Sequence, residues 1–233
     1  MRIVTLSDAS SQLSFITTAL RRFGYKTHAF SSSQELISNL LSETYDLLIL
    51  DTAGGAREVQ GVLDRIGTNI EGRVPVLFIT ERADARGIGT YLTAADDFIV
   101  KPLGAEELEP RVRALIQRAF PRVNQSELFF GPYHFSLNSC SLRFKGALID
   151  TRLKEYELAL FLFRNLGRLL SREHLRDSVW GQREARPSRS VDTHVSRLRT
   201  KLKIFPENGY SIISVYGVGY RLQQVHRSDP GGA

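Results

Sequence analysis

The chain has 233 residues, of which 42% are hydrophobic and 24% charged, an ordinary composition for a globular protein with room for two domains. No apolar run approaches the roughly 20 residues that a membrane-spanning helix needs, and the N-terminus leads directly into a strand-like pattern, so we expect no membrane segment and no secretory signal. The single cysteine, Cys140, excludes an internal disulfide and argues against a thiolate-rich metal site. The composition therefore favours a cytoplasmic protein.

The charge is divided unevenly between the two halves of the chain. The whole sequence has 31 basic and 25 acidic residues, a net charge of +6. Residues 1–120 contain 13 basic and 15 acidic residues, a net −2, whereas residues 121–233 contain 18 basic and 10 acidic residues, a net +8. This asymmetry suggests that the second half meets a polyanion.

In the first half, short apolar segments alternate with stretches of helical periodicity. Leu13, Ile16, Leu20 and Phe23 recur at steps of three and four, and Gly24 is placed to end that helix. Strands are expected at 3–6, 26–30, 46–50, 74–79 and 97–100, and further helices at 36–41, around 59–66 and at 105–119. Five strand–helix units of this kind predict an α/β fold over residues 1–119, a doubly wound five-stranded parallel sheet with helices on both faces.

The second half has a different pattern. Residues 120–126 (FPRVNQS) are expected to form a linker, and residues 226–233 a disordered tail. Between them, FFGPYHFSL and SCSLRFKG alternate apolar and polar residues as half-solvated strands do. Helices are expected at 154–165, 172–179 and 190–202, followed by a hairpin around a Gly217-x-Gly219 turn. Residues 127–225 are therefore predicted to be an α+β domain, a helix-turn-helix with a wing.

Polar residues follow four of the five strands predicted in the first half, at the edge of a parallel sheet where ligands bind. They are Ser7-Asp8, Asp51, Thr80 and Lys101-Pro102. Asp8 and Asp51 offer oxygen ligands for Mg²⁺, and Asp51 could act as a nucleophile that forms an aspartyl phosphate. Lys101 and Thr80 would then neutralise and hydrogen-bond the phosphoryl oxygens. Any one of these residues is ordinary at a strand end, but the set in strand order favours phosphoryl transfer.

One predicted helix of the basic half, 190–202, has an apolar and a polar face. Its polar face carries Thr193, Ser196, Arg197 and Thr200, with Arg189 just before the helix. Such a face suits the DNA major groove, where arginine bonds a guanine edge, and Arg197 is the candidate for base reading. The preceding helix begins after Ser171, a suitable N-cap, and is followed by Trp180, which is expected to be buried. The residues expected to hold DNA phosphates are Arg172, Arg176 and Arg189.

The first 120 residues resemble the receiver domain of two-component signalling, a flavodoxin-like fold. Asp8, Asp51, Thr80 and the run AADDFIVKPL carry the resemblance. It implies that Asp51 takes a phosphoryl group from a sensor histidine kinase, that Thr80 and Phe98 form a switch pair, and that the carbonyl of Ala53 is a third Mg²⁺ ligand. Ser7 stands where the family has a second acid, which should weaken Mg²⁺ binding. The resemblance also implies a homodimer interface formed by Asp97, Glu107 and Arg111.

Residues 127–224 resemble the winged-helix effector domain of OmpR/PhoB-type response regulators. The motifs that carry this resemblance are KEYELALFLFRN, LLSREHLRDSVWG, RSVDTHVSRLRTKL and VYGVGYRL. It implies a recognition helix at 190–202 and a wing at 215–221 that touches the minor groove. Relatives often have arginine where this chain has Tyr216 and Ser196, so we expect fewer charged contacts with DNA and a smaller dependence of affinity on salt.

The sequence is thus interpreted as a DNA-binding transcriptional response regulator that dimerises when Asp51 is phosphorylated and binds promoter half-sites, with RNA polymerase as a further possible partner. It is not expected to be an enzyme beyond catalysing its own phosphorylation and dephosphorylation. One alternative is a pseudo-receiver transcription factor that binds DNA independently of phosphorylation. A remote alternative is a phosphatase with an aspartyl nucleophile, although Ala53 stands where such enzymes commonly have a second Asp.

Overall fold

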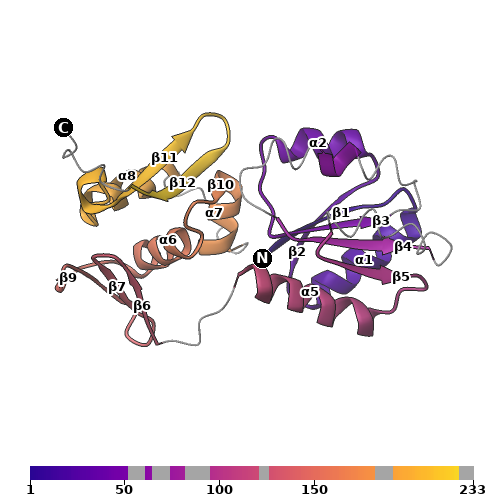
Figure 1. The fold of residues 1–233 in the computed structure, drawn as a ribbon, viewed down its shortest axis with the longest axis horizontal. Helices are drawn as coiled ribbons and strands as arrows, with labels where there is room; N and C mark the ends of the chain where they lie inside the picture. The colour runs from indigo at the N-terminus through magenta and orange to yellow at the C-terminus, as the bar shows by residue number, and fades with distance from the viewer. Residues whose placement is uncertain (52–60, 65–73, 82–94, 121–125, 182–190, 226–233) are drawn as a thin grey trace, which may run out of the picture. The chain divides into compact units, whose positions relative to one another are not determined.

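The computed structural model describes residues 1–51, 61–64, 74–81, 95–120, 126–181 and 191–225. The chain divides into two compact units, Met1–Arg122 and Val123–Ala233 (Figure 1). Each unit has its own hydrophobic core and is described by itself. Among the described residues, no helix combines the length and the apolar character that crossing a membrane requires.

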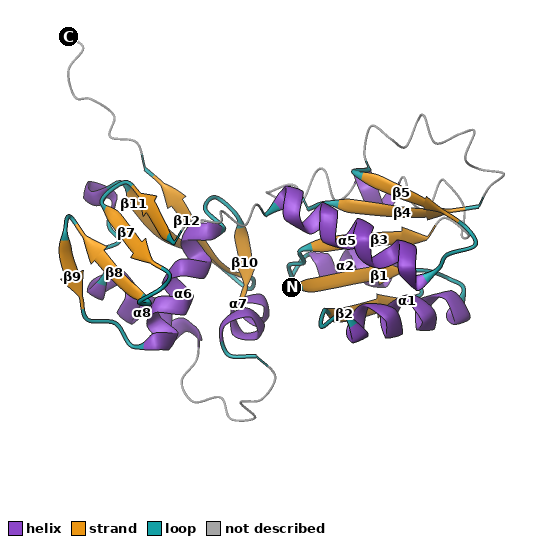
Figure 2. Ribbon diagram, turned by 90° about the horizontal axis from the view of Figure 1, so that it is seen from below, coloured by secondary structure: helices purple, strands orange, loops and turns teal. Residues whose placement is uncertain are grey.

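The first unit is a five-stranded parallel sheet in the order β2-β1-β3-β4-β5, which can be followed in Figure 2. The predicted doubly wound α/β fold is therefore confirmed. The strands are β1 (Arg2–Leu6), β2 (Lys26–Phe30), β3 (Leu47–Asp51), β4 (Val76–Thr80) and β5 (Asp97–Val100), and the described helices are α1 (Ser10–Arg22), α2 (Ser33–Leu40) and α5 (Ala105–Ala119). Residues 61–64 are also helical, whereas the remainder of the helix expected around 59–66 lies outside the described residues.

Both faces of the first sheet are covered by helices, which explains why its strands are continuous apolar runs. Ile3, Ile49 and Ile79 face α1 and α5, and Val4 and Leu50 face α2 on the other side (Figure 1). All five residues of β1, β3 and β4 are buried. The sheet is consequently a rigid support for whatever lies at its edge.

Two strand ends were each predicted one residue too early. The third strand was expected to end at Leu50 and the fourth at Ile79, but Asp51 and Thr80 still belong to β3 and β4. Asp51 pairs with Ile79 of the neighbouring strand, so backbone hydrogen bonding continues through the polar residue. Both side chains are therefore fixed by the sheet itself and are not carried by a loop.

The second unit contains two antiparallel sheets and three described helices. One sheet has the order β6-β7-β8-β9 and the other β10-β12-β11 (Figure 2). The elements are β6 (Glu127–Phe130), β7 (Tyr133–Ser136), β8 (Ser141–Phe144), β9 (Ala147–Ile149), α6 (Leu153–Arg164), β10 (Leu169–Ser171), α7 (Arg172–Val179), α8 (Val191–Lys201), β11 (Tyr210–Val215) and β12 (Gly219–Gln224). This arrangement confirms the predicted winged helix-turn-helix.

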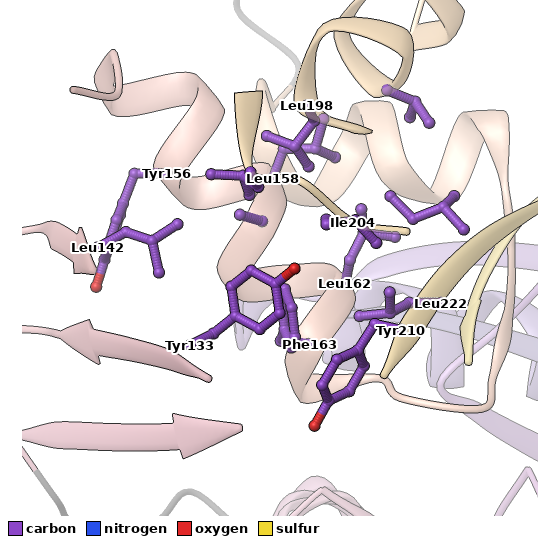
Figure 3. Packing of buried hydrophobic residues seen from close by; sticks show 14 of the residues in the cluster. Tyr133, Leu142, Tyr156, Leu158, Leu162, Phe163, Leu198, Ile204, Tyr210 and Leu222 are labelled. Atoms are coloured by element: carbon purple, nitrogen blue, oxygen red, sulfur yellow. The ribbon is translucent and has the colours of Figure 1, made fainter. Parts of the chain in front are cut away.

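Aromatic side chains join the sheets and helices of the second unit in one core. The ring of Phe163 on α6 lies 4.8 Å from that of Tyr133 on β7 and 5.2 Å from that of Tyr210 on β11 (Figure 3). Leu198 on α8 and Leu222 on β12 are buried in the same cluster. The helix α8 is thus held by its apolar face, which leaves the opposite face to solvent.

Two local predictions in the second unit have different outcomes. Ser171 is the N-cap of α7, as expected, because its hydroxyl accepts a 3.0 Å hydrogen bond from the backbone of His174. The expectation that Trp180 is buried was wrong. Trp180 is the C-cap of α7 and only half-buried, since its ring packs at the margin of the core, 4.9 Å from the ring of His194.

The C-terminal hairpin requires glycine at two places for different reasons. Gly217 has a φ of 73° and lies in the turn between β11 and β12, a conformation that side chains disfavour. Gly219 pairs with Ser171, and a Cβ atom there would lie 2.0 Å from the carbonyl oxygen of Leu170. The close pairing of β10 with β12 therefore depends on Gly219.

Candidate functional site

The carboxylate of Asp51 lies buried at the carboxyl edge of the first sheet. Its side chain has an exposed fraction of 0%, and each of its oxygens contacts a residue that follows another strand of the sheet. The ammonium of Lys101, which follows β5, lies 2.9 Å from Oδ1. The hydroxyl of Ser7, which follows β1, donates a 2.8 Å hydrogen bond to Oδ2. The Asp51 carboxylate is therefore held between a cation and a hydroxyl donor, with both of its oxygens fixed at the edge of the sheet.

Lys101 contacts a second carboxylate that the sequence patterns did not indicate. Oε1 of Glu81 lies 3.1 Å from Nζ of Lys101, and Glu81 directly follows β4. Partial burial acts to lower the pKa of Lys101, but the contacts with Asp51 and Glu81 outweigh that effect and the pKa is raised above its usual range. Lys101 is therefore a permanently charged group at physiological pH.

Thr80 and Phe98 lie on the same face of neighbouring strands. Thr80 pairs with Val100 in the register of β4 and β5, and Phe98 pairs with Phe78, two residues away from Thr80. Thr80 is buried, and its hydroxyl donates a long hydrogen bond of 3.4 Å to the carbonyl of Glu81. Phe98 is half-buried against the core cluster that contains Phe78. The two side chains therefore lie on one face of the sheet, two positions apart in the register of β4 and β5.

The residues at this edge offer Mg²⁺ a small set of oxygen ligands. Asp8 is exposed and follows Ser7, which itself touches Asp51, so the two carboxylates lie at neighbouring strand ends. The described residues contain no group of three or more His, Cys, Asp or Glu side chains suited to hold a metal. Mg²⁺ keeps several waters and needs only one or two carboxylates, so the residues fit this ion as a reduced set. Ala53, predicted as the third ligand, lies outside the described residues.

The three residues predicted at a dimer interface contact one another within the chain. Arg111 on α5 bridges two acids, with a 3.0 Å contact to Asp97 and a 3.1 Å contact to Glu107. The three side chains are partly exposed, between 22% and 40%. They form a partly exposed ion-pair network on the surface of β5 and α5.

On α8 the predicted polar face is exposed. Ser196, Arg197 and Thr200 are exposed and Thr193 is half-buried. On the opposite face, Val195, Leu198 and Leu202 are buried. Arg189, predicted just before this helix, lies outside the described residues. The long side chain of Arg197 is therefore available to a ligand in front of α8.

The arginines predicted to hold DNA phosphates have acidic neighbours. Arg172 on α7 bonds Asp192 of α8 at 2.9 Å, and its guanidinium lies 5.2 Å from the ring centre of Tyr220. Arg176 lies 3.1 Å from Glu173. These ion pairs orient the side chains of Arg172 and Arg176, which both lie on α7.

Asp192 also joins the hairpin to α8. The hydroxyl of Tyr220, on β12, donates a 2.6 Å hydrogen bond to the same Asp192 oxygen that Arg172 contacts. The hydrogen bond from Tyr220 and then the contact with Arg172 lower the pKa of Asp192, although partial burial acts in the opposite direction. Tyr220 is buried, whereas Tyr216 at the hairpin tip is fully exposed.

Comparison with known families agrees with this division of the chain. The family described as "Response regulator receiver domain" matches residues 3–113, and the family described as "Transcriptional regulatory protein, C terminal" matches residues 146–222. The sensory transduction protein RegX3 of Mycobacterium leprae is 34% identical over 159 residues, which cover 66% of this chain and 80% of the relative. The chain belongs to the OmpR/PhoB-type response regulators.

Other members of this family match almost the whole chain. RegX3 of Mycobacterium tuberculosis is 28% identical over 226 residues, covering 95% of this response regulator and 98% of the relative. The transcriptional regulatory protein ResD of Bacillus subtilis is 28% identical over 235 residues, covering 95% of each chain. A solved structure of the OmpR/PhoB homologue DrrB of Thermotoga maritima shares 23% identity over 95% of this chain and 98% of that one, with a TM-score of 0.41. The two family matches and the RegX3 and ResD relatives show that the protein is a transcriptional response regulator with a receiver and a DNA-binding domain.

Sequence patterns found the strand-end residues of this response regulator but missed two contact partners. Glu81 gave no signal because a single acid after a strand is ordinary, and its contact with Lys101 joins residues 20 positions apart. Asp192 lies in the first turn of α8, where acids are common for reasons of helix polarity alone. The sequence signal that could have indicated a role for Asp192 was its position one residue before Thr193, at the border of the polar face.

Proposed function

We propose that Asp51 is the phosphoacceptor of this response regulator and that a sensor histidine kinase is the donor. The observation that carries the proposal is the buried Asp51 carboxylate with Lys101 at 2.9 Å, at the carboxyl edge of a rigid parallel sheet. An Asp51 oxygen attacks the phosphorus of the phosphohistidine. The new O–P bond forms as the P–N bond breaks, and the imidazole nitrogen leaves with the electron pair.

Each neighbour of Asp51 has a distinct part in this transfer. The ammonium of Lys101 hydrogen-bonds the phosphoryl oxygens and balances their charge, and the hydroxyl of Thr80 donates to them once it leaves the carbonyl of Glu81. Asp8, Asp51 and the carbonyl of Ala53 would hold Mg²⁺, which supplies further positive charge to the transferred group. Ser7 replaces one acid in this set, so the proposed site binds Mg²⁺ weakly.

The signal then passes from the receiver to the DNA-binding domain by dimerisation. Movement of Thr80 toward the phosphoryl group opens space beside Phe98, and the strand β5 that carries Phe98 also carries Asp97. A shift there favours exchange of the Arg111 contacts between two chains, so that the dimer is the preferred state after phosphorylation. Two linked DNA-binding domains gain affinity for paired half-sites through their high effective concentration. Bound at a promoter, such a dimer can contact RNA polymerase.

DNA recognition is assigned to α8 and the hairpin. The exposed Arg197 reads a base edge in the major groove, with Thr193, Ser196 and Thr200 beside it, and Tyr216 enters the adjacent minor groove. Arg172, Arg176 and Arg189 contact phosphates on either side. Exposure of the polar face of α8, combined with burial of its apolar face, supports this assignment.

Labelling with phosphoramidate tests the proposed acceptor. Wild-type protein and Asp51→Asn are incubated with phosphoramidate and Mg²⁺, and the covalent phosphoryl group is detected by intact mass. We expect labelling of the wild type and none of Asp51→Asn. Equal labelling of both would move the acceptor to another residue.

A second candidate function is a pseudo-receiver that dimerises without phosphorylation. The hydrogen bond from Ser7 to Asp51 favours this candidate, because Ser7 takes the place of an acid that helps to hold Mg²⁺. Two results at millimolar Mg²⁺ would support the pseudo-receiver. The wild-type protein would remain unlabelled, and phosphoramidate would not change its dimerisation.

A further inference from the structure

Lys101 lies between two carboxylates, only one of which belongs to the proposed phosphoacceptor. Its ammonium is 2.9 Å from Asp51 and 3.1 Å from Glu81. The Lys101 side chain is 14% exposed and that of Asp51 is 0% exposed, whereas the side chain of Glu81 is 51% exposed. Glu81 therefore stands on the solvent side of the lysine, on which an incoming phosphoryl group must also arrive.

We propose that Glu81 is a positioning residue that competes with the phosphoryl group for Lys101 and thereby slows phosphorylation of the receiver. The proposal rests on the function proposed above for Asp51. It adds that Glu81, the acidic residue that follows β4, regulates the same site.

The competition follows from the hydrogen-bonding capacity of Lys101. A lysine ammonium has three N–H donors. Here the carboxylates of Asp51 and Glu81 each lie within hydrogen-bonding distance of the ammonium and can each accept from one donor. When the Asp51 oxygen attacks phosphorus and the bond to the leaving group breaks, Lys101 must turn a donor to the phosphoryl oxygens. Asp51 and Glu81 leave one donor free, so a second contact of Lys101 with the phosphoryl oxygens requires displacement of the Glu81 carboxylate, which adds to the barrier to transfer.

Glu81 also acts through its charge. The Glu81 carboxylate lies 3.1 Å from the lysine that contacts Asp51, so it repels an anionic phosphodonor that approaches this lysine as well as compensating the lysine charge. Because about half of the Glu81 side chain is exposed, solvent screens both effects. An ion pair of this exposure corresponds to a roughly two- to fivefold effect on rate.

The backbone of Glu81 connects this competition to the switch residue. The hydroxyl of Thr80 donates to the carbonyl oxygen of Glu81 at 3.4 Å, a long bond that Thr80 gives up when it turns to the phosphoryl group. Movement of Thr80 and departure of the Glu81 side chain from Lys101 are therefore expected to occur together.

The experiment compares Glu81→Gln with wild type and with Glu207→Gln. Both variants remove one negative charge and keep the side-chain size, but Glu207 is an exposed residue of the second unit. The initial rate of labelling by phosphoramidate is measured at constant Mg²⁺ and at several salt concentrations. We expect Glu81→Gln to be labelled about two- to fivefold faster than wild type. The ratio should fall toward one at high salt, because salt screens exposed charges. Glu207→Gln should match the wild type.

Including Asp51→Asn separates failure of this proposal from failure of the acceptor assignment. If Asp51→Asn is unlabelled while Glu81→Gln is no faster than wild type, the role of Glu81 is wrong and the acceptor stands. If Asp51→Asn is labelled like wild type, both proposals are wrong. Labelling of Glu81→Gln in a preparation whose wild type is unlabelled supports the role of Glu81, whereas absence of labelling from both overturns it. Equal thermal unfolding midpoints of wild type and Glu81→Gln exclude a folding defect.

Discussion

The hydroxyl of Ser7 donates a 2.8 Å hydrogen bond to Asp51, so the residue after β1 directly contacts the carboxylate that ends β3. Ser7 has an exposed fraction of 1%. Ser7 is a neutral donor that fixes the orientation of the Asp51 carboxylate, but it cannot replace a carboxylate as a metal ligand. Ser7 and Lys101 together therefore hold the two oxygens of Asp51 in place at the proposed receiver site.

Replacing Ser7 by aspartate should raise Mg²⁺ affinity. Ser7→Asp adds a second acid beside Asp8, and changes next to metal ligands commonly alter affinity by about tenfold or more. In the absence of Mg²⁺ the same substitution should lower stability, because Asp51 then meets a like charge instead of a donor. Calorimetric titration with Mg²⁺ and urea unfolding with and without the ion measure both effects.

Ser7→Ala is the matched control for that substitution. It removes the hydrogen bond to Asp51 without adding charge, and should cost about 1–3 kcal/mol in the free energy of unfolding. Its Mg²⁺ affinity should not rise. Weaker Mg²⁺ binding by Ser7→Asp than by wild type would show that the ion does not use this edge of the sheet.

Reversing the charge of Arg111 should weaken the phosphorylation-dependent dimer. Arg111→Glu places a third carboxylate beside Asp97 and Glu107, which Arg111 now neutralises at 3.0 and 3.1 Å. Like charges at an interface are costly, so the dimer dissociation constant should rise by about tenfold or more. Sedimentation of phosphoramidate-treated protein measures the constant. The double variant Asp97→Arg, Arg111→Glu restores opposite charges and should recover dimerisation, and an unchanged dimer in the single variant would exclude this surface.

Two arginines of the DNA-binding domain should have separable effects on DNA binding. Arg176→Ala removes a phosphate contact, so it should weaken binding to all sequences alike and reduce the slope of log affinity against log salt by about 1. Arg197→Ala should instead reduce discrimination between specific and random DNA, by about 1–3 kcal/mol. Fluorescence anisotropy on both DNAs over a salt series distinguishes them. Equal effects of the two variants on both DNAs would contradict these roles.

Asp192 should make the stability of the DNA-binding domain sensitive to acid. Its pKa is lowered in the folded state by Tyr220 and Arg172, so its contribution is present above about pH 4 and is lost as pH falls through the folded-state pKa. Because 48% of the side chain is exposed, solvent screening limits the contribution to about 1 kcal/mol or less. Urea unfolding at several pH values should show a smaller loss of stability between pH 5 and pH 3 for Asp192→Asn than for wild type. Parallel curves would mean that Asp192 contributes nothing.

Several elements were predicted to the residue, whereas the short strand β10 and the contact partners at the site were not. The spacing of apolar residues placed β5 at 97–100, α5 at 105–119 and α7 at 172–179, as the structure has them. The three-residue strand β10 was missed because three residues are too few to show alternation, and it exists only through pairing with β12.

For the candidate site, strand ends could be predicted because a parallel sheet brings its carboxyl ends to one edge. The contact between Ser7 and Asp51 could not, since it depends on the register of β1 and β3 and on the rotamer of a small side chain. The same holds for Asp192, which Arg172 and Tyr220 reach from 20 and 28 positions away. The sequence pattern therefore predicts the helix or strand on which a residue lies, whereas tertiary packing determines which other residues it contacts.

The most direct test of the account is the response of DNA binding to a phosphodonor, measured for wild type and Asp51→Asn. Both proteins are used to capture fragments from a genomic library with and without phosphoramidate and Mg²⁺, and the affinity for the enriched fragments is then determined. We predict that phosphoramidate increases the affinity of wild-type protein for fragments with two half-sites and leaves Asp51→Asn unchanged. An equal increase for both proteins, or none for the wild type, would contradict control of DNA binding through Asp51.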